Sequence, residues 1–238
     1  DIVNLNNLDP DKPFQFENDP PDEARGQQAD IKTIELFIQD QISIDAGLFQ
    51  GVKMNLGTRF HSFENDAQIL TREQSEDEFT SRFELVYTPP ERKWLTVYGN
   101  FSESFEAQVT TGENMMGDLV GDPVEPKTGE QFEVGTKAEF LDGDLLFTAA
   151  YFDLTEENRA VNVNTDANPV FETIGEAENE GFEFSLNGQL NPRLQVLAQY
   201  TINDAEITQN QEDPDLVGNQ LPKTPYQSGS LWLRYNAT

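Results

Sequence analysis

The chain has 238 residues, no cysteine and a formal net charge of -29, and 11% of its residues are aromatic. The acidity argues against nucleic acid as a partner, because a polyanion is repelled and no basic stripe is present. The lack of cysteine excludes disulfides, thiolate metal sites and a thiol nucleophile, and no run reaches the roughly 18 apolar residues of a membrane helix. The acidity fits a saline habitat, or attraction of cations and basic partners.

Residues 1–30 are rich in Asp, Asn, Pro and Gln and have no period, so we expect an irregular extracellular loop segment there. Residues 31–238 instead contain segments in which apolar and polar residues alternate, which is typical of β-strands with two different faces. We expect about nine strands, near 31–44, 51–63, 79–88, 94–105, 131–140, 145–153, 182–190, 193–203 and 228–236.

The connections between these strands alternate between short and long. The short ones lie near 45–51, 89–93, 141–144 and 190–193, and the long, acid-rich ones near 64–78, 106–130, 155–175 and 204–227. This alternation is typical of an outer-membrane β-barrel, with short periplasmic turns, long extracellular loops and strands that are apolar outside and polar inside. A soluble sandwich or lectin stays possible, because its strands also alternate.

The first strand contains a polar triplet, Gln39, Asp40 and Gln41, within an apolar run. On a strand, Gln39 and Gln41 point toward the barrel interior, whereas Asp40 shares the lipid-facing side with Ile38 and Ile42. A charge on that side is costly at the membrane midplane and cheap near the interface. We therefore expect Asp40 near the periplasmic interface, bonded to a neighbouring strand or turn.

Short motifs in a fixed order resemble the C-terminal half of a TonB-dependent siderophore receptor, closest to the ferrichrome/hydroxamate type. Each motif is weak alone, but together they extend over residues 31–236. They are LFIQDQISI, LGTRFHSF, FTSRFELVYTP, LTVYGNFSESFEA, EPKTGEQFEVGTKAEF, LLFTAAYFDLTEEN, GEAENEGFEFSLNGQL, VLAQYTINDAEIT, VGNQLPKTP and SLWLRY.

The resemblance implies an all-β fold, a partial antiparallel transmembrane β-barrel with about nine of the roughly 22 strands that enclose a plug in such transporters. Neither the plug nor the family's terminal strand is matched, so we expect the chain to be part of a larger receptor. The implied function is import of a ferric siderophore across the outer membrane of a Gram-negative bacterium, coupled through the plug to the TonB–ExbB–ExbD system.

Three alternatives stay open: a TonB-dependent transporter of cobalamin or a glycan, a passive porin-like barrel, and a soluble acidic β-domain for binding. A plug in the upstream sequence would support a coupled transporter over a passive barrel. Extraction as a water-soluble protein without detergent would identify the soluble β-domain.

No enzyme and no cofactor are expected. His61 is the only histidine, which leaves no histidine-based triad or zinc set, and no carboxylate spacing marks a glycosidase. Segments 162–169 and 210–219 have oxygen-rich spacing but lack the EF-hand pattern, so we interpret them as solvated loops and predict no metal site.

A ligand site is expected on the inner face of the strands. Arginine and lysine there could pair with the oxygens of a ferric chelate, and a tyrosine could stack on it. The alternative is a structural network in which Arg59 and Arg82 face Glu84, Glu133 and Glu139. The candidates are Arg59, His61, Arg82, Tyr98, Asn100 and Lys137.

The remaining motif residues are expected to be structural. Phe105 belongs to the segment in which one strand leaves the membrane, and Thr128 with Gly129 makes the turn before the next. Glu130, Glu133 and Lys137 then line the polar side. The complete structural set is Gln39, Asp40, Gln41, Phe105, Gly129, Glu130, Gly135, Gly181 and Trp232.

Overall fold

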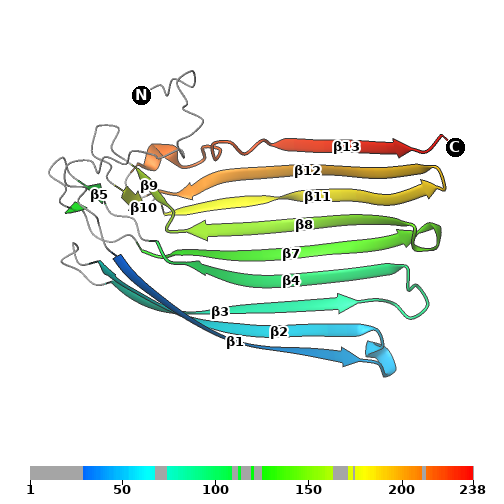
Figure 1. Cartoon of the computed structure of the whole chain (residues 1–238), viewed down its shortest axis with the longest axis horizontal. Coiled ribbons are helices and arrows are strands. Elements are labelled where there is room, and N and C mark those ends of the chain that lie inside the picture. The colour runs from blue at the N-terminus through cyan, green and yellow to red at the C-terminus, as the bar shows by residue number, and fades with distance from the viewer. Residues whose placement is uncertain are drawn as a thin grey trace, which may run out of the picture.

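The computed structural model describes residues 29–67, 74–108, 112–113, 119–120, 125–162, 171–173, 175–210 and 213–237. In this part of the chain, nine long strands form one antiparallel sheet in the order β1-β2-β3-β4-β7-β8-β11-β12-β13 (Figure 1). The all-β fold and the nine strands predicted from alternation are confirmed. Residues 1–28 lie outside the described residues, so the loop predicted there stays a prediction, but its predicted end at residue 30 is wrong because Ala29 and Asp30 already belong to the first strand.

Eight of the nine strands are longer than the roughly 9–11 residues that a tilted strand needs to cross a bilayer, and β13, with nine residues, is within that range. Their bounds are β1 Ala29–Ile44, β2 Val52–Ala67, β3 Gln74–Tyr87, β4 Leu95–Glu106, β7 Lys127–Phe140, β8 Leu145–Glu157, β11 Glu176–Asn191, β12 Leu194–Gln209 and β13 Gln227–Tyr235. No helix in the described residues is long and apolar enough to cross a bilayer.

The smaller elements lie between the long strands. They are the strand pairs β5 (Gly112–Glu113) with β6 (Leu119–Val120) and β9 (Ala160–Asn162) with β10 (Phe171–Thr173), and the 3-10 helices η2 (Gly47–Phe49), η3 (Leu141–Gly143) and η4 (Pro214–Leu216).

The short connections all lie at one end of the sheet, as predicted (Figure 1, right). We call this the short-turn end, and the opposite end the loop end. Strands reach further toward the loop end than the alternation indicated. The acidic run Glu76, Asp77 and Glu78 belongs to β3, and Thr128 and Gly129 are paired residues of β7. The predicted turn at Thr128–Gly129 is therefore wrong.

The register separates the sheet into two faces. One row across neighbouring strands runs Gln41, Asn55, Glu84, Asn100 and Glu133, so this inner face is polar. The outer face carries large apolar side chains that are exposed, such as Ile38 at 71% and Leu231 at 68%. A soluble sandwich would bury such a face, whereas a membrane strand presents it to lipid.

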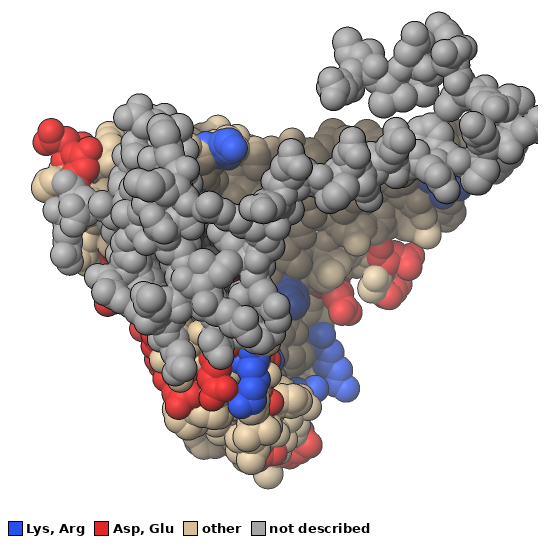
Figure 2. Space-filling view, turned by 60° about the vertical axis from the view of Figure 1, so that its left-hand side comes forward, with Lys and Arg blue, Asp and Glu red and all other residues tan. Residues whose placement is uncertain are grey.

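The outer face changes from apolar to acidic toward the loop end. One row across β4, β7, β8, β11 and β12 runs Glu103, Glu130, Thr155, Glu178 and Glu206. Figure 2 shows acidic side chains gathered at this end. Glu130 therefore faces outward, and its predicted place on the polar inner side with Glu133 and Lys137 is wrong, because residues three apart on a strand point to opposite faces.

Asp40 lies on the outer face of β1, opposite Leu56 of β2. It is exposed and makes no hydrogen bond or ion pair with the described part of the chain. The expected bond to a neighbouring strand or turn is therefore wrong. Gln39 and Gln41 are paired with Gly57 and Asn55 on the inner face, as the alternation predicts.

Candidate functional site

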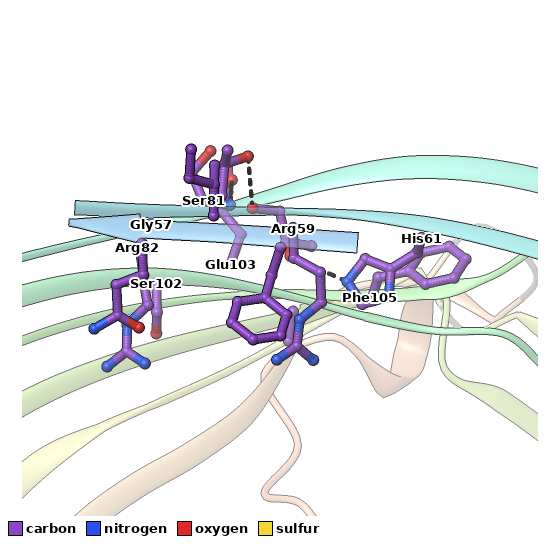
Figure 3. Close-up of a pocket in the computed structure, with 14 residues that line it drawn as sticks. Gly57, Arg59, His61, Ser81, Arg82, Ser102, Glu103 and Phe105 are labelled. Atoms are coloured by element: carbon purple, nitrogen blue, oxygen red, sulfur yellow. Dashed lines mark hydrogen bonds between the residues drawn. The ribbon is translucent and has the colours of Figure 1, made fainter. Parts of the chain in front are cut away.

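A hollow of about 440 Å³ lies where β1 to β4 meet on the inner face, in the half of the sheet nearer the loop end (Figure 3). It brings together three of the six predicted ligand-site residues, Arg59, His61 and Arg82. Its full lining is Phe37, Ile38, Gln39, Gly57, Thr58, Arg59, His61, Thr80, Ser81, Arg82, Ser102, Glu103, Ser104 and Phe105.

The two arginines of the hollow come from adjacent strands, and Figure 3 shows their guanidinium groups pointing the same way. Arg59 lies 5.9 Å from the ring centre of Phe37, and its Nη1 is 3.5 Å from Oε2 of Glu35. Arg82 lies across Gly57, where an added Cβ would be 3.0 Å from its Cγ. Arg82 forms no ion pair with any described residue, so its charge is available to an anion.

His61 is held in place at the edge of the hollow. The residue is only 7% exposed. Its Nε2 is 3.1 Å from Oγ1 of Thr80, and its Nδ1 is 3.3 Å from Oε1 of Glu35. Its ring centre is 5.3 Å from that of Phe105. Because both ring nitrogens already have partners, the ring acts as a wall of the hollow that also fixes the carboxylate beside Arg59.

The other three predicted residues form a separate group toward the short-turn end. The Tyr98 hydroxyl donates to Oε1 of Glu133 at 2.7 Å, and Nζ of Lys137 lies 5.1 Å from the centre of the Tyr98 ring. Asn100 lies in register between Glu84 and Glu133. Tyr98 therefore contacts both Glu133 and Lys137, which favours a role in the wall for this group.

The alternative network of Arg59 and Arg82 with Glu84, Glu133 and Glu139 is not formed among the described residues. Glu84 instead accepts a hydrogen bond from Asn55, and Glu133 accepts from Tyr98. The partner of Arg59 is Glu35 on β1, which the sequence reasoning did not select.

Phe37 is the second contact that the sequence reasoning missed. It lies directly opposite Arg59 on the inner face of β1. The alternation in the sequence already indicated this contact. Phe37 occupies an inner-face position between Glu35 and Gln39, so an aromatic side chain is expected among the polar ones of that face.

The structural motif residues lie on five strands, β1, β4, β7, β11 and β13. Gly129 packs against Oγ of Ser104, Gly181 against the backbone at Ile202 and Asn203, and Gly135 against the ring of Tyr98. Trp232 lies opposite Leu197 on the inner face. Phe105 contacts His61 and lines the hollow. The structural role predicted for each stays a prediction.

The two segments considered for calcium are only partly described. Residues 163–170 and 211–212 lie outside the described residues. In the described part of 210–219, the Asn210 side chain accepts from the Asp213 backbone, and the Asp213 side chain caps η4 at the Asp215 backbone. No cluster of three or more metal-ligating side chains occurs among the described residues.

An antiparallel sheet with an exposed apolar outer face, a polar inner face and all its short turns at one end defines part of a membrane β-barrel wall. The family comparison agrees. Residues 2–238 match the family described as TonB dependent receptor-like, beta-barrel, and the chain belongs to this family.

Two curated relatives illustrate the similarity. The probable TonB-dependent siderophore receptor PiuA of Acinetobacter baumannii is 26% identical over 87% of this chain and 30% of its own length. The ferrichrome outer membrane transporter/phage receptor of Escherichia coli K12 is 29% identical over 84% of this chain and 25% of its own length. The chain therefore spans about a third or less of these relatives.

The fold also matches solved structures. The ferripyoverdine receptor of Pseudomonas aeruginosa, solved with ferripyoverdine bound, superposes with a TM-score of 0.66 at 25% identity. The alignment covers 88% of this chain and 27% of that one.

Proposed function

We propose that the chain is part of the wall of an outer-membrane receptor that imports a ferric siderophore in a Gram-negative bacterium. Family membership supports energy coupling through TonB, ExbB and ExbD rather than a passive porin-like barrel. The exposed apolar outer face supports a place in the outer-membrane lipid rather than a soluble binding domain. Coupling to TonB requires a plug domain. The proposal that this protein has one is based on family membership alone.

The observation that carries the proposal is the hollow on the inner face with Arg59 and Arg82. In a chain of net charge -29, two guanidinium groups that point into one hollow create a local site for an anion. Guanidinium groups bind oxygen anions through charge-assisted hydrogen bonds, and ferric chelates present such oxygens. The aromatic ring of Phe37 beside Arg59 offers a stacking surface for the organic part of the chelate.

The substrate class follows from the relatives rather than from the hollow. Their names include siderophore, ferrichrome and ferripyoverdine receptors, which supports a siderophore over cobalamin or a glycan. These chelates differ, so the proposal stops at the class of ferric siderophores. The ferric chelate is the cargo, and the proposal includes no catalytic residue and no resident cofactor.

Radiolabelled iron uptake tests the proposal. Iron-limited cells with the full-length gene deleted are given a panel of ferric siderophores, with and without restoration of the gene, and again in a strain that lacks TonB. Restoration should raise uptake of at least one siderophore only when TonB is present. Unchanged uptake of every siderophore would count against import, and uptake independent of TonB would indicate a passive barrel.

A further inference from the structure

The seam between β3 and β4 is paired over only part of its length. β3 pairs with β2 as far as Asn65 and Gln74, but its pairing with β4 ends at Arg82 and Ser102. β4 pairs with β7 up to Glu106 and Lys127. No described strand covers the β4-facing edge of residues 74–81. An open strand edge in a barrel wall is unfavourable, because its backbone groups lack partners.

Side chains take the place of the missing ladder at this edge. The Ser81 N–H donates to Oε2 of Glu103 at 2.8 Å, and the Phe79 N–H donates to Oε1 of Glu78 at 3.2 Å. Continuing the register one step beyond Arg82 and Ser102 puts Ser81 directly opposite Glu103. Ser81 is therefore bound to the side chain of the residue whose backbone would pair with it if the ladder continued.

The open part of the seam joins two hollows. The hollow with Arg59 and Arg82 and a second one of about 500 Å³ share Thr80, Glu103 and Ser104. The second hollow is lined by outer-face residues of the acidic row, including Glu130. Figure 3 shows Glu103 and the two guanidinium groups on opposite sides of the ribbons. The seam therefore connects the inner face with the outer face.

We propose that this seam is a lateral opening in the barrel wall, which closes when residues 79–81 of β3 pair with residues 103–105 of β4. Closure forms the missing backbone hydrogen bonds and brings Phe79 opposite Phe105, an aromatic pair that stabilises antiparallel strands. The structure shows the open state.

The open state has its own stabilising contacts, which closure removes. The Glu103 carboxylate loses its charge-assisted bond to Ser81, and the ring of Phe105 leaves that of His61. The freed carboxylate then faces Glu130, its register partner on β7, and like charges directly opposite each other are destabilising. Closure therefore exchanges one set of stabilising contacts for another, which makes the seam a two-state element.

Disulfide trapping in the full-length protein, in outer membranes, tests the proposal, and these 238 residues contribute no cysteine of their own. One variant carries Thr80→Cys and Ser104→Cys, which face each other only when the seam is closed. The control variant carries Glu84→Cys and Asn100→Cys, which are paired in the structure. The N–H of Ser81 points to β4, so Ser81 occupies a hydrogen-bonded position of this strand pair. Thr80 and Glu84 are an odd number of residues away and occupy non-hydrogen-bonded positions, where the Cα atoms of opposite residues are close.

The expected result is that the Thr80→Cys/Ser104→Cys pair crosslinks at least about tenfold more slowly than the control pair, because a minor state typically holds roughly 0.1–10% of the molecules. Adding Glu103→Gln should accelerate the seam crosslink about tenfold, which corresponds to about 1.4 kcal/mol. Adding Asp142→Asn, the same charge change at the short-turn end, should leave the rate unchanged.

Three results would overturn the proposal. Equal crosslinking rates for the two pairs would show a seam that is always closed. A seam pair that never crosslinks, even with Glu103→Gln, while the control pair does, would show a permanently open wall. An effect of Asp142→Asn as large as that of Glu103→Gln would show that net charge, not the Ser81 contact, controls the rate. None of these depends on siderophore uptake.

Discussion

The ring of Tyr98 on β4 covers Gly135, its register partner on β7, so closely that a Cβ atom added to Gly135 would lie 2.6 Å from both Cζ and the hydroxyl of Tyr98. The same atom would lie 2.9 Å from the carbonyl oxygen of Ala149. Gly135→Ala should therefore displace the ring from Glu133 and lower the free energy of unfolding by about 1–3 kcal/mol, as overpacking does. Urea unfolding of the full-length protein in detergent measures this change.

Gly99→Ala is the matched control for Gly135→Ala, since Gly99 also lies within a strand of the same sheet. Its nearest atom to an added Cβ is the Glu133 carbonyl oxygen at 3.7 Å, an ordinary contact. We expect this variant to unfold within about 0.5 kcal/mol of the parent, as substitutions away from such features do. Equal losses for the two variants would show that the glycine matters for its backbone rather than for the ring above it.

Arg82 should determine ligand affinity, because its guanidinium group points into the hollow without an ion-pair partner among the described residues. Arg82→Gln should weaken binding of an anionic ferric chelate about 10- to 150-fold, the range for a hydrogen bond to a charged group worth about 1.5–3 kcal/mol. Titration of the purified receptor with that siderophore gives the dissociation constant. Arg193→Gln, in the short connection between β11 and β12, is the control and should leave affinity unchanged.

The acidic row on the outer face should destabilise the sheet in a salt-dependent manner. Glu178 and Glu206 are direct register partners on β11 and β12, and like charges at such positions repel each other. Glu178→Gln should stabilise the protein by about 0.2–1 kcal/mol at low ionic strength, and the gain should shrink at about 1 M salt, where the screening length is roughly 3 Å. A gain that salt leaves unchanged would argue against repulsion.

The sheet could be predicted from the sequence because a period of two reports directly on the two faces of a strand. The alternation of short and long connections also predicted the direction of each strand and placed the short turns at one end of the sheet, which the structure confirms. Arg59, His61 and Arg82 were selected for the same reason, since alternation assigns a side chain to a face without knowledge of its neighbours.

Strand ends and contacts between strands could not be predicted in the same way. Beyond the membrane both faces of a strand are wet, so the acidic residues of β3 near Glu76 show no alternation and resemble a loop. The pairing of Arg59 with Glu35 depends on the register between β1 and β2, which one sequence does not contain. The error at Glu130 came from placing a turn at Gly129, where the strand has already begun.

Asp40 provides the sharpest test of the outer face. It lies among exposed apolar side chains of β1, including Ile38 and Ile42, and has no bonding partner in the described part of the chain. A charge facing lipid is costly, by about 2–4 kcal/mol for arginine or lysine at the midplane and less for aspartate. Asp40→Leu should therefore raise the free energy of unfolding in lipid by up to about 2 kcal/mol. Gln41→Leu, one residue along on the inner face, is the control and should give no gain. Equal effects of the two variants would mean that β1 does not present its Asp40 face to lipid.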